Sequence, residues 1–151
     1  MAEGPRLGID WGKARIGVAA CNRGTRFAYP VETVPVDGRE FDRLAALVAE
    51  YEPEIIYIGL PLTLGGERAI AATHVLEQVG QLAARLPEVP IRLVDERLST
   101  AGASRSLGSA GRSKRQQRAV IDQAAAVEIL QRALDREATG NPAGSALGEE
   151  E

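Results

Sequence analysis

The sequence has a single cysteine, Cys21, so no disulfide can form within the chain. Aromatic residues make up only 4% of the composition, which argues against a nucleic-acid reader built mainly on base stacking. No apolar run reaches the roughly 20 residues that span a bilayer. The N-terminus also lacks the basic start and apolar stretch of a secretory signal. We therefore expect a cytoplasmic protein without a membrane role.

The length of 151 residues and the hydrophobic content of 44% fit one ordinary domain with one core. The formal net charge is −3, but three of the 21 acidic residues close the chain, and the remaining 18 balance 18 basic residues. We expect the domain to occupy residues 1–137. Residues 138–151 are poor in apolar side chains, so we expect them to form a disordered acidic tail.

The first third of the chain has the pattern of an antiparallel sheet. Residues 6–21 contain two short apolar runs separated by a polar turn with glycine, which predicts a β-hairpin. Residues 26–36 are rich in β-branched and aromatic side chains and predict a third strand. Pro30 and Pro35 cannot donate ladder hydrogen bonds, so this strand is expected near an edge.

The remainder alternates helix and strand. Apolar residues at helical spacing predict helices over residues 41–51 and 67–86, each followed by a short apolar strand, at 54–60 and 91–96. Such alternation implies parallel pairing and an α/β fold. We expect a short helix at about 101–107, then a mobile basic loop, and a long final helix at about 114–136.

Some acidic residues stand where the apolar pattern predicts a hydrophobic side chain. Asp10 ends an apolar strand, and Gly12 beyond it leaves room for a ligand. Asp95 and Glu96 end another strand, and alternation allows only one of them to share the core-facing side. The alternatives are structural. Asp10 could be a turn aspartate that accepts from its own backbone, and the acid at 95 or 96 could stand at a helix N-terminus or pair with Arg97.

Asp122 is the most informative of these acids, because on a helix it shares one stripe with small apolar residues. That stripe contains Ala119, Ala125, Ala126, Ile129 and Ala133. The pattern turns this carboxylate toward the sheet, where a salt bridge to a sheet arginine is the alternative. Carboxylate oxygens suit Mg²⁺ or Mn²⁺ better than zinc. Two such ions could support in-line displacement at phosphorus.

A local excess of positive charge precedes and enters the final helix. Residues 97–121 carry no acid and the following basic side chains: Arg97, Arg105, Arg112, Lys114, Arg115 and Arg118. For binding a polyanion, the distribution of charge matters more than its sum. This segment is therefore a candidate contact for nucleic acid.

Four segments in order, GIDWGKARIGVA, IGLPLTLGGE, VDERLST and VIDQAAAVEIL, resemble the YqgF family, also called RuvX. Its members are described as pre-16S rRNA nucleases and Holliday junction resolvases. The resemblance runs over residues 7–134, and it is the ordered set of four that makes it specific. It implies a single ribonuclease H-like domain. The sheet would have five strands, three antiparallel and then parallel ones, with helices on both faces.

The resemblance also implies a site. It assigns Asp10, Glu96 and Asp122 as catalytic metal ligands for Mg²⁺ or Mn²⁺, and it makes Asp95 the less favoured ligand. Arg15, Lys114 and Arg115 match positions that are usually basic in the family, where phosphate contact is expected. With Arg97, Arg112 and Arg118 they form our predicted nucleic-acid-binding set. The chain departs from the family pattern at residues 63–65, which leaves contact by the loop Thr63 to Gly66 undecided.

The resulting hypothesis is a metal-dependent nuclease that hydrolyses phosphodiesters and processes the ends of pre-16S rRNA, with ribosomal particles as further partners. The alternatives are a Holliday junction resolvase acting on branched DNA and a noncatalytic nucleic-acid-binding module. Resolution of a junction needs two symmetric sites, and the sequence shows no evident dimer stripe, so we expect a monomer or weak homodimer. An actin-like kinase would need two such domains, for which the chain is too short.

Overall fold

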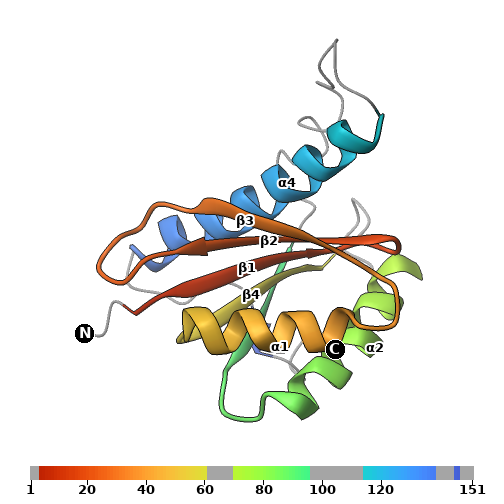
Figure 1. The fold of residues 1–151 in the computed structure, drawn as a ribbon. Coiled ribbons are helices and arrows are strands. Elements are labelled where there is room, and N and C mark those ends of the chain that lie inside the picture. The colour runs from red at the N-terminus through yellow and green to blue at the C-terminus, as the bar shows by residue number, and fades with distance from the viewer. Residues whose placement is uncertain (1–3, 61–69, 96–113, 139–144, 147–151) are drawn as a thin grey trace.

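The computed structural model describes residues 4–60, 70–95, 114–138 and 145–146. Three strands open the chain, and helices and strands then alternate (Figure 1). The elements are β1 (Arg6–Trp11), β2 (Arg15–Cys21), β3 (Tyr29–Pro35), α1 (Glu40–Tyr51), β4 (Ile55–Leu60), α2 (Ile70–Arg85), β5 (Ile91–Asp95), α4 (Lys114–Glu137) and β6 (Ser145–Ala146). The short helix and basic loop expected between β5 and α4 lie outside the described residues.

The strands form one mixed sheet in the order β3-β2-β1-β4-β5-β6. β1 pairs antiparallel with β2, and β2 with β3, whereas β4 lies parallel to both β1 and β5. The predicted five-stranded mixed sheet is therefore confirmed. Ser145 and Ala146, which lie in the segment expected to be a disordered tail, add a two-residue strand antiparallel to β5.

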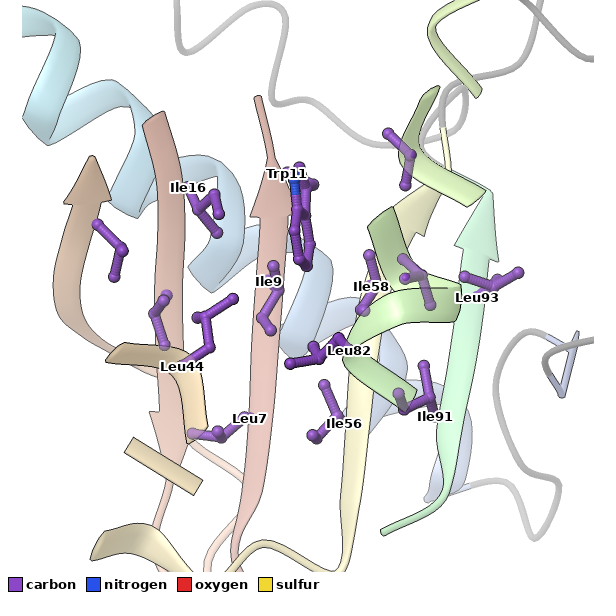
Figure 2. Packing of buried hydrophobic residues seen from close by; sticks show 14 of the residues in the cluster. Leu7, Ile9, Trp11, Ile16, Leu44, Ile56, Ile58, Leu82, Ile91 and Leu93 are labelled. Atoms are coloured by element: carbon purple, nitrogen blue, oxygen red, sulfur yellow. The ribbon is translucent and has the colours of Figure 1, made fainter. Parts of the chain in front are cut away.

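One face of the sheet carries the larger apolar side chains and is covered by α1 and α2 (Figure 1). β1 contributes Leu7, Ile9 and Trp11 to this face, since alternate residues of a strand point the same way (Figure 2). Leu44 of α1 and Leu82 of α2 pack against them. The ring of Trp11 lies 5.9 Å from that of Phe41, between centroids, which joins the end of β1 to α1.

The opposite face is covered by α4 (Figure 1). Its buried side chains are mostly small, and the exceptions are one tyrosine and two leucines. The cluster contains Ala19, Cys21, Tyr57, Ala126, Leu130, Ala133 and Leu134. Helices are thus present on both faces, as predicted, and the stripe of small residues on the final helix is the side that packs on the sheet.

Candidate active site

Asp10 is the penultimate residue of β1, and only 6% of its surface is exposed. Its neighbours Ile9 and Trp11 belong to the core under α1 and α2, so alternation places Asp10 on the face that α4 covers. A carboxylate removed from water is costly unless hydrogen bonds, a cation or a metal compensate it. Its burial makes Asp10 the strongest candidate for a functional acid in the described residues.

Glu40 is the other acid that is buried in the described part of the chain, at 8% exposed, and it has a structural explanation. It opens α1, and its Oε1 accepts a hydrogen bond of 2.8 Å from the backbone N–H of Gly38. Gly38 has a φ of 96°, so the acid stabilises a turn at the start of the helix. Asp10 lies within strand β1, so the explanation for Glu40 does not apply to it.

Glycines surround Asp10 on the α4 face. Gly17 of β2 is its direct cross-strand partner, and Gly8 and Gly12 lie two residues before and after it along the chain. A Cβ at Gly12 would lie 2.5 Å from the carbonyl oxygen of Arg15, which accepts the Gly12 N–H at 2.9 Å. Gly12 is therefore required by the hairpin turn. The sequence pattern predicts that Gly12 leaves room for a ligand. The structure explains this glycine by the turn instead.

Helix α4 runs antiparallel to β1 across this face. Near its C-terminal end, Glu137 forms an ion pair of 3.0 Å with Arg6, the first residue of β1. Further back along the helix, the carbonyl oxygen of Ala126 would lie 3.0 Å from a Cβ placed on Gly8. The helix therefore packs directly against the backbone of β1 at Gly8.

A polar contact fixes the position of α4 along the strands. Gln123 donates from Nε2 to Oγ1 of Thr33 on β3 at 3.0 Å. Thr33 pairs with Gly17, and Gly17 pairs with Asp10, so the three residues form one row across β3, β2 and β1. Gln123 thus lies level with the row that contains Asp10.

The backbone of residue 122 lies in α4, one turn before Ala126. Four residues of helix advance about 6 Å, and two residues of strand advance about 6.6 Å. Ala126 lies beside Gly8, and α4 and β1 run in opposite directions. The distance along α4 from Ala126 back to residue 122 therefore nearly equals the distance along β1 from Gly8 forward to Asp10. The side chain of Asp122 is outside the described residues, but its backbone position is on the level of Asp10.

Arg15 begins β2 and is half-buried. It precedes Gly17, the partner of Asp10, by two residues, and such diagonal neighbours on one sheet face have Cα atoms about 7–8 Å apart. Ala19 and Cys21, which share its parity, lie in the cluster under α4. Arg15 and Asp10 are therefore near neighbours on the same face and at the same end of the sheet.

The other predicted site residues are not placed. Glu96, Arg97 and Arg112 lie outside the described residues, as does the loop Thr63 to Gly66. The backbone of the first turns of α4 is described without the side chains of Lys114, Arg115 and Arg118. Among the described residues, no three His, Cys, Asp or Glu side chains lie together as a metal-binding group. The convergence of Asp10 with Glu96 and Asp122 stays a prediction.

The sequence reading missed a polar cluster at the other end of the same face. The Glu137 carboxylate binds the Arg6 guanidinium and accepts a hydrogen bond from the hydroxyl of Tyr57, which is fully buried. Burial raises the pKa of Tyr57, and its hydrogen bond to Glu137 raises the pKa further. An acid in the last turn of α4 is the only sequence signal for this cluster, which anchors the helix at the end opposite Asp10.

Among the helices of the described segments, none has the length and apolarity to cross a bilayer.

Comparison with known proteins gives a consistent result. The family model described as "RuvX: Holliday junction resolvase" matches residues 4–136. A protein of Cutibacterium acnes named "Putative pre-16S rRNA nuclease" is 52% identical over 133 residues, which cover 88% of this chain and 83% of that protein. A protein of the same name from Streptomyces coelicolor is 47% identical over 97% of this chain and 90% of its own length.

Solved structures add the fold. Thermus thermophilus RuvC in complex with a Holliday junction substrate superposes with a TM-score of 0.62 at 16% sequence identity, covering 95% of this chain and 99% of that one. At this identity the likeness concerns the fold, which is ribonuclease H-like, as predicted. Since the family model spans nearly all of the folded chain and the relatives reach half identity, the protein belongs to the RuvX family.

Proposed function

We propose that this protein is a metal-dependent nuclease that processes the ends of pre-16S rRNA, with Asp10, Glu96 and Asp122 as its catalytic acids. The observation that carries the proposal is Asp10, a buried strand carboxylate bordered by glycines and level with residue 122 of α4. The names of the relatives from Cutibacterium acnes and Streptomyces coelicolor supply the RNA substrate.

The donor set suits Mg²⁺ or Mn²⁺, because carboxylate oxygens are the ligands that these hard cations prefer. In β5, Leu93 lies in the core under α1 and α2, whereas Val94 packs on the α4 side. Continued alternation from Val94 would turn Glu96 toward the face of Asp10. When bound, the metal would lower the pKa of a water and stabilise charge on the phosphate.

The chain's own residues would bind and orient the substrate. Arg15, about 7–8 Å from Asp10 across the strands, would hold a phosphate beside the acids. The basic residues of the 97–118 stretch, Arg97, Arg112, Lys114, Arg115 and Arg118, would contact the backbone on either side.

The test compares cleavage of end-labelled pre-16S RNA fragments in Mn²⁺ by the wild type and by Asp10→Asn, Glu96→Gln and Asp122→Asn. Each variant should lose at least about a hundredfold to a thousandfold in rate, since metal-held charge stabilisation is worth several kcal/mol. Asp42→Asn is the matched control, because Asp42 is an exposed acid of α1. An Asp10→Asn protein that cuts at the wild-type rate would contradict the proposed site.

Metal binding gives a second readout that does not depend on cleavage. Mn²⁺ at a hundred times its dissociation constant should stabilise the wild type by about 2.7 kcal/mol, and Asp10→Asn should abolish this gain. Thermal unfolding with and without Mn²⁺ measures it. Equal stabilisation of both proteins would place the ion elsewhere.

A second candidate, cleavage of four-way DNA junctions, is favoured by the description of the family model and by the RuvC fold. It would use the same acids on branched DNA and would require two sites related by symmetry. Junction substrates belong in the same assay, together with sedimentation of the protein. Junction cutting by a dimer, with RNA left intact, would move the assignment to this function.

A further inference from the structure

The loop between β2 and β3, residues 22–28, presents an aromatic ring to solvent. Phe27 is 78% exposed, and it is the one large hydrophobic side chain that stands exposed in the described part of the chain. Arg23 and Arg26 on the same loop are also exposed. An isolated exposed apolar residue is ordinary on a protein surface. What distinguishes Phe27 is how the loop around it is built.

The loop is held together by hydrogen bonds of its own. The backbone N–H and the hydroxyl of Thr25 both donate to the carbonyl oxygen of Asn22, at 3.1 and 2.9 Å. Gly24, with a φ of 80°, supplies the left-handed residue of this turn. The hydroxyl of Tyr29 donates to Oδ1 of Asn22 at 2.8 Å. The segment is therefore a defined turn leading into β3.

Helix α4 fixes the backbone on both sides of the ring. Gln131 donates from Nε2 to the carbonyl oxygen of Arg26 at 2.8 Å, and its Oε1 accepts from the N–H of Ala28 at 2.9 Å. One side chain thus binds the residue before Phe27 and the residue after it. An exposed ring held in this way loses little conformational entropy when a ligand stacks on it, because its backbone is already ordered.

The chemistry of the loop suits a single-stranded nucleic acid. A base can stack on an exposed aromatic ring whatever its sequence, and phosphates bind guanidinium groups. One acid, Asp135, lies nearby and reduces the positive charge of the two arginines. It belongs to α4 and not to the loop, and it accepts a hydrogen bond from Gln131 at 3.1 Å. The two arginines of the loop therefore favour an anionic partner with flat rings over an apolar one.

The loop and the candidate active site are joined by β3. Thr33 lies in the row of Asp10, and Phe27 precedes Thr33 by six residues. Gln123 of α4 binds Thr33 in that row and Gln131 binds the backbone on both sides of Phe27, so eight helical residues, about 12 Å, separate the two levels. At the roughly 3.4 Å per nucleotide of one duplex strand, this separation corresponds to a few nucleotides.

We propose that the β2–β3 loop is a base-stacking site for single-stranded RNA, with Phe27 stacking on a base a few nucleotides from the phosphate at Asp10 and Arg23 and Arg26 binding the adjoining backbone. This inference rests on the proposed nuclease function only for the path of the RNA from the loop to Asp10. The site itself is made by residues remote from the acids.

The experiment measures binding of a fluorescently labelled single-stranded RNA in EDTA, so that cleavage plays no part. Phe27→Leu keeps an apolar side chain without a ring, and Phe27→Trp keeps a ring. Stacking of a base is worth enough that Phe27→Leu should bind about tenfold to a hundredfold more weakly. Phe27→Trp should bind within about twofold of the wild type. Equal binding by all three proteins overturns the proposal.

Arg23→Gln should weaken binding and reduce its dependence on salt by about one counterion, whereas Arg85→Gln on α2, remote in the sequence and on the other face, should do neither. Sedimentation of the same variants tests a second copy of the chain as the occupant. A dimer that dissociates in Phe27→Leu while RNA binding is unchanged would overturn the stacking site. Ring-dependent binding by a protein that cuts no RNA would support the loop and refute the nuclease.

Discussion

The two faces of β1 are built on opposite principles. The odd residues Leu7, Ile9 and Trp11 fill a core of large side chains under α1 and α2. On the even side, Gly8 and Asp10 face α4, which approaches the strand backbone directly. The first face is stabilised mainly by the burial of large apolar side chains. On the second face, α4 packs against the backbone of β1, and polar contacts add to this packing. The face with fewer large side chains carries the candidate active site.

The same contrast appears in what holds each helix. α2 is attached through buried apolar residues such as Val79 and Leu82. α4 also uses apolar contacts, but specific polar contacts fix its position along β1: Gln123 to Thr33 near the middle of the helix and Glu137 to Arg6 and Tyr57 at its C-terminal end. Apolar burial is nondirectional, whereas hydrogen bonds fix register. A helix that carries a proposed catalytic acid, Asp122, would depend on the second kind of attachment.

The largest expected effect on stability is on the apolar face. Leu82→Ala removes a fully buried side chain and should lower the free energy of unfolding by about 2–5 kcal/mol. Leu76→Ala makes the same deletion at a half-buried position of α2 and should cost less. Urea unfolding of both variants gives the comparison. Equal losses would mean that the depth of burial does not distinguish the two sites.

On the α4 face the damaging change is the addition of an atom. A Cβ at Gly8 would lie 2.6 Å from Cβ of Leu130, so Gly8→Ala should displace α4 and cost about 1–3 kcal/mol. Gly80→Ala in α2 meets nothing within 4 Å and should stabilise the helix by up to about 1 kcal/mol. Opposite signs in thermal unfolding are the expected result. Gly8→Ala should also slow cleavage by shifting residue 122 away from Asp10.

High pH should test the hydrogen bond between Tyr57 and Glu137 at the C-terminal end of α4. The raised pKa of Tyr57 means that, above about pH 10, the unfolded chain releases this proton while the folded protein keeps it. Stability therefore falls as pH rises through this range, by at most about 1.4 kcal/mol per pH unit for one proton. Tyr57→Phe should lose stability less steeply than the wild type above pH 10. Parallel curves from pH 9 to 11 would show that the Tyr57 pKa is not raised.

The smallest expected change in stability comes from the other anchor. Gln123→Ala removes one partly buried hydrogen bond and should cost about 0.5–1.5 kcal/mol. Cleavage should fall more than this loss of stability explains, because the bond sets α4 level with Asp10. A double-mutant cycle with Thr33→Val isolates the pair. Additive losses would show that the bond does not couple α4 to β3.

Much of the fold could be predicted because strand and helix periods differ. Alternation at residues 6–21 and helical spacing at residues 41–51 identified the hairpin and α1, and prolines at positions 30 and 35 marked β3 as an edge strand, as the structure shows. The strand at residues 145–146 was missed, since two residues carry no periodic signal. Pairing with the edge of β5 is a contact that forms only once the sheet exists.

Asp10 could be singled out because an acid interrupts an apolar strand, and its burial agrees with that reading. The reason for the neighbouring glycines could not be read in the same way. Gly12 serves the hairpin turn, and Gly8 admits the backbone of a helix more than 110 residues later in the chain. Gln131 reads as a surface residue of a helix, yet it holds the loop that carries Phe27.

The sequence by itself determined the elements, the mixed α/β sheet and the acids that break the apolar pattern, because these depend on the order of side chains along a strand or helix. Only the tertiary structure decided that α4 lies antiparallel to β1, that it packs against the backbone of Gly8 and that Gln123 sets it level with Asp10. Such contacts join residues far apart in the chain, and local periodicity carries no information about their distance.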